Sequence, residues 1–450
     1  MDISSLIPQF GGAIWTLLAF VLALSVIIAI HEYGHYIVGR LSGIRAEVFS
    51  IGFGPVIWAR QDKRGTVWQI AALPLGGYVR FAGDANAASG KDATAMRGAQ
   101  DDPQRLRETM HGAPLWARTL TVAAGPAFNF ALSILVFAAV LMSSGAPVEP
   151  LSVGALRPMP QAERGLKPGD QLLEIDGRAV PSASDEGGYA AFLAQLPAQP
   201  DLRYRVERGG QAVDVTDAPL LPPLVSALSP QSAAMAAGLQ VGDVITAIDG
   251  QAIFVFEQLK AAVEGGAGAP LSLTVWRRGE SLTMVLQPKR VDEPLPEGGF
   301  ATQWRIGVAG GMSFDPLTQA MGPGQALTGG AAQVGRIITG SLSGLGHMIS
   351  GAISTCNLSG PIGIAQTSGA MASQGALSFV WFIAVLSTAV GLLNLFPVPA
   401  LDGGHLVFFA YEAISGRPPS DGALRILMTV GLALVAGLMV FALGNDLFCP

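Results

Sequence analysis

The chain has 450 residues, of which half are hydrophobic and only 13% are charged. A soluble domain usually carries about 25% charged residues, so this deficit predicts membrane-spanning segments. The formal net charge of −6 argues against a nucleic-acid partner. Cys356 and Cys449 form no CxxC pair, so the sequence indicates neither a disulfide framework nor a thiolate metal site. A single bridge between them is an open alternative that we do not expect.

Four stretches reach the roughly 20 apolar residues that a membrane-spanning helix needs. The first, Gly11–Ile30, has no charge, and we favour a span over a signal peptide because no basic residue precedes it and no cleavage pattern follows. The others are Thr119–Met142, Gly375–Phe396 and Ile426–Leu443. The last of these lies within a transmembrane helix expected over 424–444. The sequence therefore predicts a polytopic α-helical membrane protein with about four transmembrane helices.

The positions of the basic residues predict the orientation. Residues 38–115 contain ten Lys or Arg, whereas the residues before the first span contain none. The positive-inside rule therefore places 38–115 in the cytoplasm. Alternation of the spans then puts both termini and 143–374 outside, which in a bacterium means an inner-membrane protein with a periplasmic segment.

The outside segment contains an internal repeat. Arg164–Gly177 and Ala237–Gly250 both run a GL-x-x-GD turn into an alternating strand that ends in a tight Asp-Gly turn. With the helix and strand pair that follow each copy, the pattern resembles two tandem PDZ-like α/β domains, over 148–220 and 222–291. Such domains bind peptides by strand addition, so periplasmic peptides or ectodomains are the expected partners. Inert spacers are the alternative, and 181–202 is rich in Pro, Ala and Ser, which would suit a degenerate first groove.

Three further segments have simpler patterns. Residues 44–83 alternate β-formers around the polar turn Gln61–Gly65, which predicts a hairpin, either membrane-associated or cytosolic. Residues 84–114 are polar and predict a mobile cytoplasmic linker. Residues 324–355 are rich in Gly, Ala and Ser with scattered apolar positions, which predicts an amphipathic helix at the outer membrane surface.

The residues that carry chemistry begin with His31-Glu-Tyr-Gly-His35, which follows the first span and continues its helix within 1–43. Histidines at i and i+4 share one helical face and can bind one Zn²⁺, while Glu32 can act on a water as general base. A polar helix end at the membrane interface is the alternative. Ionisable residues that border a span are costly and usually functional, so we favour the metal site.

Catalytic zinc takes three protein ligands and keeps one open position. The segment 375–405 ends the third span with Asn394-Leu-Phe-Pro-Val-Pro-Ala-Leu-Asp402. Because the third span runs inward, Asp402 reaches the same membrane level as His31 and is the expected third ligand. His405 is the main competitor for that role.

The second span, within 115–143, contains Gly125-Pro-Ala-Phe-Asn129. Pro126 interrupts the hydrogen-bond ladder of the helix, and Asn129 places an amide inside lipid. A kink with a bridging amide is one interpretation. We favour the other, in which this span shapes the cavity around the metal.

Together, HEYGH, AAGPAFNF, the tandem repeats and NLFPVPALDGGH resemble the site-2 protease family of intramembrane zinc metalloproteases, over nearly the whole length. Further matching motifs are FSIGFGP, PLGGYVRF and NLSGPIGIA. The resemblance implies a transmembrane zinc core and a membrane-dipping sheet. It also implies His31, His35 and Asp402 as zinc ligands and Glu32 as the catalytic acid/base.

The resemblance further implies that Asn394 and Pro399 support substrate handling. The implied substrates are single-pass membrane proteins, chiefly an anti-sigma factor of the envelope stress response already clipped in the periplasm, and also remnant signal peptides. A non-catalytic membrane scaffold that binds periplasmic peptides is the main alternative, and the intact glutamate of HEYGH argues against it. A zinc transporter is less favoured, because no further polar residues line a path across the bilayer.

Overall fold

The computed structural model forms two compact units, which we describe separately. The first unit comprises Met1–Val140, Gly324–Gly346 and Thr355–Pro450, and the second comprises Leu141–Pro323 and His347–Ser354. The structure describes residues 12–85, 91–99, 101–160, 163–182, 185–295 and 299–449.

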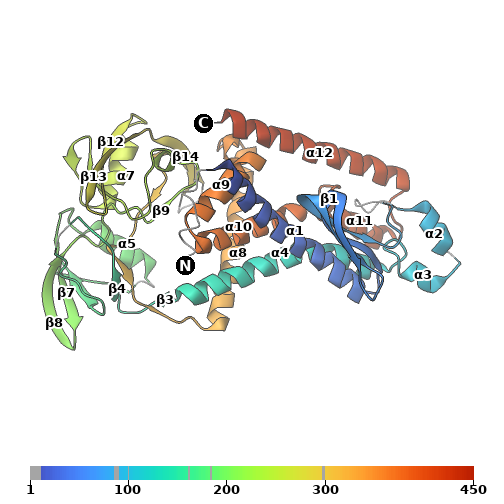
Figure 1. Cartoon of the computed structure of the whole chain (residues 1–450), viewed down its shortest axis with the longest axis horizontal. Coiled ribbons are helices and arrows are strands. Elements are labelled where there is room, and N and C mark those ends of the chain that lie inside the picture. The colour runs from blue at the N-terminus through green and yellow to red at the C-terminus, as the bar shows by residue number, and fades with distance from the viewer. Residues whose placement is uncertain are drawn as a thin grey trace. The chain divides into compact units, whose positions relative to one another are not determined.

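The first unit is mainly helical, with one two-stranded sheet (Figure 1). Among the described residues, four helices are long and apolar enough to cross a membrane, in agreement with the four predicted stretches. They are α1 (Ala13–Leu41), α4 (Leu115–Ser144), α10 (Ala376–Asn394) and α12 (Asp421–Phe448). Gly11, where the first predicted stretch begins, lies outside the described residues. The shorter helices of the unit are α2 (Ala93–Ala99), α3 (Pro103–Arg107), the 3-10 turn η2 (Thr355–Asn357), α9 (Pro361–Ser373) and α11 (Asp402–Ser415).

Small residues bring these helices together, while large apolar side chains point outward. A Cβ on Gly34 of α1 would lie 2.6 Å from the carbonyl oxygen of Ala124 in α4, so only glycine permits this contact. In α12, Ile426 and Val440 are 67% and 70% exposed. Close backbone approach at small residues and an apolar outer surface are typical of helices packed within lipid.

The helix α8 (Pro323–Ile349) covers part of 324–355 and crosses the direction of α4 in the view of Figure 1. Its Val334 packs with Phe137 of α4 and Ala384 of α10. By length and composition α8 is not among the candidate spans of the described chain, which fits the predicted amphipathic helix. Its place at the outer membrane surface stays a prediction.

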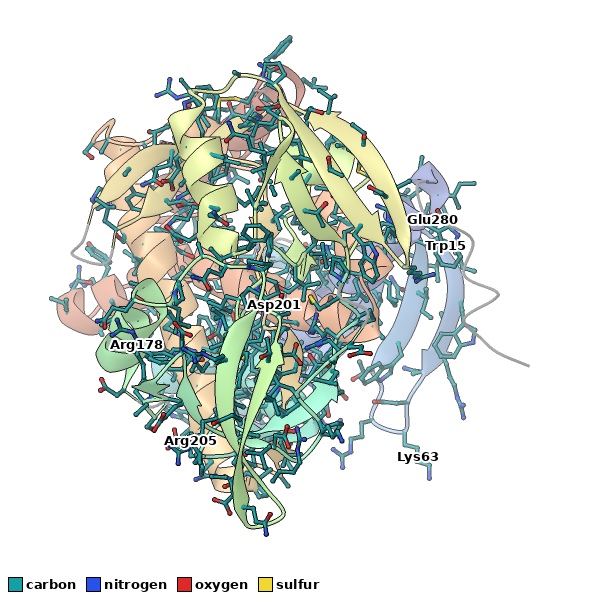
Figure 2. The ribbon with its side chains drawn as sticks, turned by 90° about the vertical axis from the view of Figure 1, so that its left-hand side faces the viewer. Trp15, Lys63, Arg178, Asp201, Arg205 and Glu280 are labelled. Carbon is teal, nitrogen blue, oxygen red and sulfur yellow. A yellow bond between two sulfur atoms is a disulfide. The ribbon has the colours of Figure 1, made fainter. Side chains whose placement is uncertain are left out.

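The predicted hairpin over 44–83 is present as β1 (Ala46–Gln61) and β2 (Val67–Phe81), paired antiparallel. Its base is buried against α1 and the start of α4, where Phe49 and Phe81 are 3% and 4% exposed. Figure 2 shows Lys63 in the turn that joins the two strands. The outer part of the hairpin exposes large apolar side chains, namely Phe53, Val56, Ile57, Trp58, Ile70 and Leu73.

The segment 84–114, expected as a mobile cytoplasmic linker, contains the short helices α2 and α3, and Met110 and Ala113 are buried in the same core as the hairpin base. The polar composition of the segment gave no sign of these apolar contacts. Its mobility and its place in the cytoplasm stay predictions. Residues 86–90 and 100 of the segment lie outside the described residues.

The second unit contains two repeats of the same topology. The four-stranded sheets have the orders β6-β5-β7-β8 and β11-β10-β12-β13, and one helix follows the second strand of each sheet along the chain. The first repeat has β4 (Val153–Leu156), β5 (Gln171–Ile175), β6 (Arg178–Ala179), α5 (Glu186–Ala194), β7 (Leu202–Arg208) and β8 (Gln211–Asp217). The second repeat has β9 (Ala227–Leu228), α6 (Ala233–Ala236), β10 (Val244–Ile248), β11 (Gln251–Ala252), α7 (Phe256–Gly265), β12 (Leu271–Arg277) and β13 (Glu280–Leu286).

Strands beyond residue 291 complete both repeats. β16 (Val308–Ala309) pairs with β9 of the second repeat, and β17 (Phe314–Pro316) pairs with β4 of the first. Ile306, just before β16, is buried in the core of the second repeat, and Phe314 of β17 is buried in the core of the first. The remaining pairs of the unit are β14 (Lys289–Pro294) with β15 (Phe300–Arg305), and β3 (Ala146–Pro147) with β18 (Thr318–Gln319).

Cys356 and Cys449 form a disulfide, which we did not expect from the sequence. They lie 93 residues apart, but the end of α12 returns to the segment that precedes α9. There the Asp446 carboxylate accepts hydrogen bonds from the backbone N–H groups of Gly360 and Ile362, which caps the start of α9. The pairing was wrongly disfavoured because only the tertiary fold brings the two ends together.

Candidate metal centre

Three side chains that were predicted as metal ligands converge in the first unit. The Nε2 atoms of His31 and His35 are 3.1 Å apart, and they lie 3.2 and 3.5 Å from Oδ2 of Asp402. Among the described residues, these three form the group of potential ligand atoms that could hold a metal ion. His31 is buried and the other two are largely buried.

Helix α1 positions both histidines on one face, four residues apart, as the motif predicts. The ring of His35 is fixed from its other side, because its Nδ1 lies 2.8 Å from the carbonyl oxygen of Thr121 in α4. A carbonyl only accepts, so Nδ1 carries the proton and Nε2 presents a lone pair to the centre. The motif HEYGH gives no sign of this contact.

Helix α4 passes directly behind the histidine rings. A Cβ on Gly125 would collide with Nε2 of His35 and lie 2.8 Å from the ring of His31, so a side chain at this position would displace the ligands. Pro126 follows and remains within a continuous helix. The carboxamide of Asn129 is buried and lies 3.2 Å from Nδ1 of His31. The interpretation of this span as a wall of the metal cavity therefore agrees with the geometry.

Asp402 is the first residue of α11 and not the end of α10. The turn between the helices is tight because Gly403 and Gly404 approach the carbonyl oxygens of Phe396 and Val398 more closely than any Cβ would allow. This packing aims the carboxylate at α1. Its Oδ2 is a buried polar atom without a hydrogen-bond partner. A buried and unsatisfied carboxylate is costly, which indicates that this oxygen pairs with a bound cation such as a metal ion.

The donor set fits a zinc ion. Tetrahedral coordination with bonds of about 2.0–2.1 Å places neighbouring ligand atoms about 3.3 Å apart, and the three separations of 3.1, 3.2 and 3.5 Å match this value. Two imidazoles and one carboxylate form a set that is common in catalytic zinc sites with one open position. Other divalent transition metals would accept the same ligands, so the choice of zinc needs further support.

Glu32 follows the first ligand but faces the hairpin. A Cβ on Gly77 of β2 would lie 3.1 Å from Cγ of Glu32, so the strand passes close over this side chain. Its carboxylate interacts electrostatically with both histidines, with Asp402 and with the backbone N–H of Val79. Glu32 is thus beside the centre and outside the ligand group.

The remaining predicted residues lie near the centre in sequence but have other contacts. The amide of Asn394 donates to the carbonyl of Val390 in its own helix. Pro399 lies in the turn before α11, where Gly431 of α12 packs against it. His405 lies one turn beyond Asp402, packs against Phe408, and is not a member of the ligand group.

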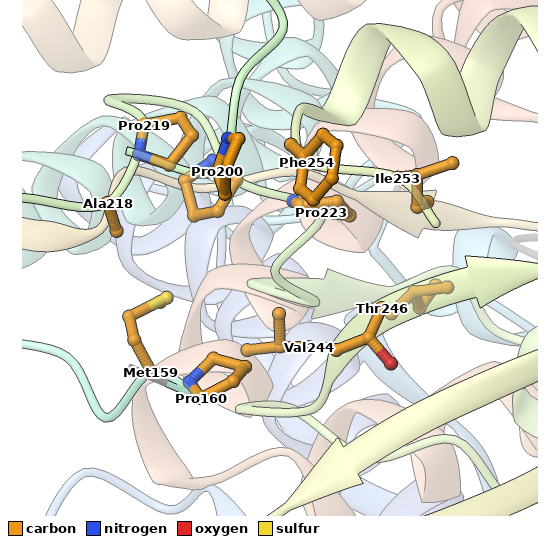
Figure 3. Close-up of a pocket in the computed structure, with 12 residues that line it drawn as sticks. Met159, Pro160, Pro200, Ala218, Pro219, Pro223, Val244, Thr246, Ile253 and Phe254 are labelled. Atoms are coloured by element: carbon orange, nitrogen blue, oxygen red, sulfur yellow. The ribbon is translucent and has the colours of Figure 1, made fainter. Parts of the chain in front are cut away.

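A separate pocket lies in the second unit and has no metal-binding character. It has a volume of about 150 Å³ and is lined mainly by prolines and apolar side chains of both repeats. Figure 3 shows Pro219, Pro223 and Phe254 on one side of it and Met159 and Val244 on the other. Since none of its lining residues is acidic, basic or a histidine, it is not a candidate catalytic centre.

Residues 19–438 match the model of peptidase family M50. The chain therefore belongs to this family, that of the site-2 proteases, and is a membrane metalloprotease. The predicted resemblance is confirmed.

Among its relatives, a protein of Agrobacterium fabrum that is provisionally named a zinc metalloprotease is 35% identical over 95% of this chain and 94% of its own length. Metalloprotease MmpA of Caulobacter vibrioides is 34% identical, over 97% of this chain and 96% of its own. Regulator of sigma-E protease RseP of Salmonella typhimurium is 32% identical, over 96% of this chain and 98% of its own. The name of the Agrobacterium fabrum relative supports zinc as the metal.

Proposed function

We propose that this protein is a zinc endopeptidase that cuts transmembrane segments of single-pass membrane proteins. His31, His35 and Asp402 hold the zinc, and Glu32 is the general acid/base. The observation that carries the proposal is the convergence of three ligand atoms within 3.5 Å of one another, two from the candidate membrane span α1 and one from α11, which follows the candidate span α10. A scaffold that only binds peptides has no use for such a group.

The hydrogen bonds behind the histidines support ligation through Nε2. His35 already donates from Nδ1 to Thr121. His31 needs an acceptor for its own Nδ1 proton, and the Oδ1 of Asn129, which has no partner, becomes that acceptor when the carboxamide turns by 180°. Fixing the tautomer from the outer side in this way is how proteins tune metal-bound histidines. Asn129 would therefore orient a ligand, in addition to shaping the cavity.

When bound, zinc supplies Lewis acidity that polarises the scissile carbonyl and lowers the pKa of water to about 7. Glu32 takes the proton from the attacking water and returns it to the leaving amine. The backbone N–H of Val79 in β2 favours the charged form of this carboxylate. Because β2 also passes close over Glu32 at Gly77, the hairpin takes part in building the site.

A helical substrate hides its carbonyls in hydrogen bonds, so it must unwind before it is cut. The β1–β2 hairpin is a sheet of two strands and therefore has outer edges that could pair with an unwound segment. Its exposed apolar side chains, such as Trp58 and Leu73, suit contact with lipid or with that segment. Asn394 and Pro399 would support the substrate near the turn that carries Asp402.

The two repeats are proposed as PDZ-like domains that control access. Both have a helix beside a sheet of equal topology, and short return strands complete them. By the predicted orientation they lie in the periplasm, with the metal centre towards the cytoplasmic side of the inner membrane. They would sense or exclude the ectodomains of substrates.

An anti-sigma factor is the favoured substrate class because one relative is named a regulator of sigma-E protease. Remnant signal peptides form a second class. Both are single membrane-spanning segments with a short outer part, which fits a site that acts on an unwound helix. The name of the relative is the only support for a role in stress signalling.

The decisive test compares purified wild-type and Glu32→Gln proteins with a labelled single-span substrate in detergent. We expect cleavage by the wild type, loss of cleavage in the variant, and zinc in both. An equal lack of cleavage by wild type and variant, across substrates with short and long outer parts, would favour the peptide-binding scaffold.

A further inference from the structure

An ion pair joins the start of α4 to the end of α11, away from the three candidate metal ligands. The Arg118 guanidinium makes two hydrogen bonds to the Glu412 carboxylate, Nη2 to Oε1 at 2.6 Å and Nη1 to Oε2 at 3.0 Å. Its Nε donates to the carbonyl of Ala113, and its plane lies 5.2 Å from the ring centre of Phe409. Both charged side chains are largely buried, with exposures of 15% and 17%.

Arg118 shares one face of α4 with the residues that hold the histidine ligands. Arg118, Thr121, Gly125 and Asn129 follow each other at steps of three, four and four residues, the spacing of a single helical face. Thr121 and Asn129 contact the outer nitrogens of His35 and His31 respectively. One face of α4 thus contacts both histidines directly and the helix of the third ligand at its far end.

Helix α11 is held at both ends. At its start, Gly403 and Gly404 pack against the turn that precedes Asp402. At its other end, Glu412 is fixed by Arg118. Ten residues of helix span about 15 Å, so once Glu412 is released a rigid α11 turns about the glycine packing at its start, and the direction in which the Asp402 carboxylate points turns with it. Metal–ligand distances tolerate only about 0.2 Å.

We propose that Arg118 is a positioning residue for the metal centre, which sets the place of Asp402 through Glu412 and the rigid helix α11. Neither Arg118 nor Glu412 touches the ligand group. The proposal depends on the proposed function, in which Asp402 is a zinc ligand. Arg is suited to this task because a bidentate guanidinium–carboxylate pair fixes orientation as well as distance.

The test uses the full-length protein with Arg118→Gln, Glu412→Gln and Arg118→Lys, together with the exchanged pair Arg118→Glu/Glu412→Arg. Arg417→Gln is the matched control, because Arg417 lies just beyond α11 and its exposed side chain forms no ion pair within the described part of the chain. Zinc affinity is measured by competition with a chelator. We expect a loss of about 10-fold to 100-fold in the two Gln variants, a smaller loss in Arg118→Lys, partial recovery in the exchanged pair, and no change in the control.

Hydrogen exchange of the metal-free proteins separates positioning from simple stability. Positioning predicts faster exchange at the first turn of α11, residues 402–406, while α1 and α4 keep their protection. Faster exchange throughout the helices, or a change confined to the residues around Glu412, would overturn the proposal. So would unchanged zinc affinity in both Gln variants. If the wild type binds no zinc, the proposed function fails, and the exchange at 402–406 still decides whether Arg118 positions Asp402.

Discussion

The two units of the molecule bury aspartates in opposite ways. In the first unit, Oδ2 of Asp402 faces two histidine nitrogens and has no hydrogen-bond donor. In the second unit, the GD aspartates Asp170 and Asp243 are buried more deeply, with side chains 1% exposed, yet every oxygen has a donor. The same residue type is left unsatisfied in one unit and fully satisfied in the other.

The satisfied aspartates show the internal repeat at the level of single hydrogen bonds. Arg208 donates from Nε and Nη2 to the two oxygens of Asp170, and Arg277 does the same for Asp243. Each arginine also donates to the carbonyl of the glycine that begins the GL turn. A backbone N–H completes each set, at Lys167 or Gln240.

This difference distinguishes the carboxylates of Asp170 and Asp243, which stabilise turns, from the carboxylate of Asp402, whose Oδ2 has no donor. Burial alone would raise the pKa of Asp170, but the hydrogen bonds from Arg208 and Lys167 outweigh it and hold the pKa below its usual range. Such an aspartate fixes a turn, because donors already occupy three of its about four lone-pair sites. Oδ2 of Asp402 has no donor, and its neighbours are two histidine nitrogens.

The largest effect is expected from Glu32→Gln, which tests the chemistry of the first unit. Loss of the general base should reduce cleavage by at least about 10²–10⁴-fold. Zinc should stay bound, because Glu32 lies outside the ligand group. Metal analysis of the purified variant checks this. Loss of zinc together with activity would make Glu32 a ligand and the assignment wrong.

The second prediction concerns the unsatisfied aspartate itself. Asp402→Ala should lower both zinc occupancy and activity, since it removes the only anionic ligand of the three. Asp402→Asn should disturb packing less and activity about as much. His405→Ala is the matched control, one turn further along α11, and should retain zinc. The opposite pattern, with metal lost only in His405→Ala, would identify His405 as the third ligand.

The third prediction concerns control of access by the second unit. Pro147 and Thr318 are paired neighbours, so residues 148–317 can be replaced by a short Gly-Ser linker that removes both repeats together with their return strands. Cleavage of a substrate with a short outer part should persist. A substrate with its full ectodomain should now be cut as well, although the intact enzyme should reject it. Loss of cleavage of the short substrate would instead indicate that the repeats recruit substrates.

The smallest effect on cleavage is expected from Asp170→Asn and Asp243→Asn, which test the structural aspartates. Each should destabilise its repeat by roughly 1–3 kcal/mol, because a partly buried arginine loses its charged partner, and zinc content should not change. Thermal unfolding of the second unit and metal analysis provide the measurements. A fall in zinc content in either variant would contradict the separation of roles.

The lowered pKa of Asp170 also predicts that the stability of the folded protein depends on pH. The pKa of Asp170 is lower in the folded protein than in the unfolded chain. Its contribution to stability is therefore complete above the unfolded pKa of about 3.9 and is lost as the pH falls through the folded value. The acid unfolding curve of Asp170→Asn should accordingly be flatter than that of the wild type, and parallel curves would contradict the assignment.

The sequence by itself determined most of the elements of this protein. Spans of sufficient length, the i, i+4 histidines and the GL-x-x-GD repeats are local patterns, and local patterns report helices, strands and turns directly. Asp402 was also within reach, because the alternation of spans returns it to the level of His31. The family followed from the same motifs.

Only the tertiary structure decided which distant groups meet. The Cys356–Cys449 bridge, the carbonyl of Thr121 behind His35, the ion pair of Arg118 with Glu412 and the return strands β16 and β17 all join residues far apart in the chain. None of these contacts has a periodicity or a spacing that a sequence displays. A backbone carbonyl is common to every residue, so the sequence does not mark the one that will bind a histidine. An arginine or a cysteine gains its partner only when helix packing brings one of many candidates close. The convergence of His31, His35 and Asp402 was therefore predictable, whereas the contacts that surround them were not.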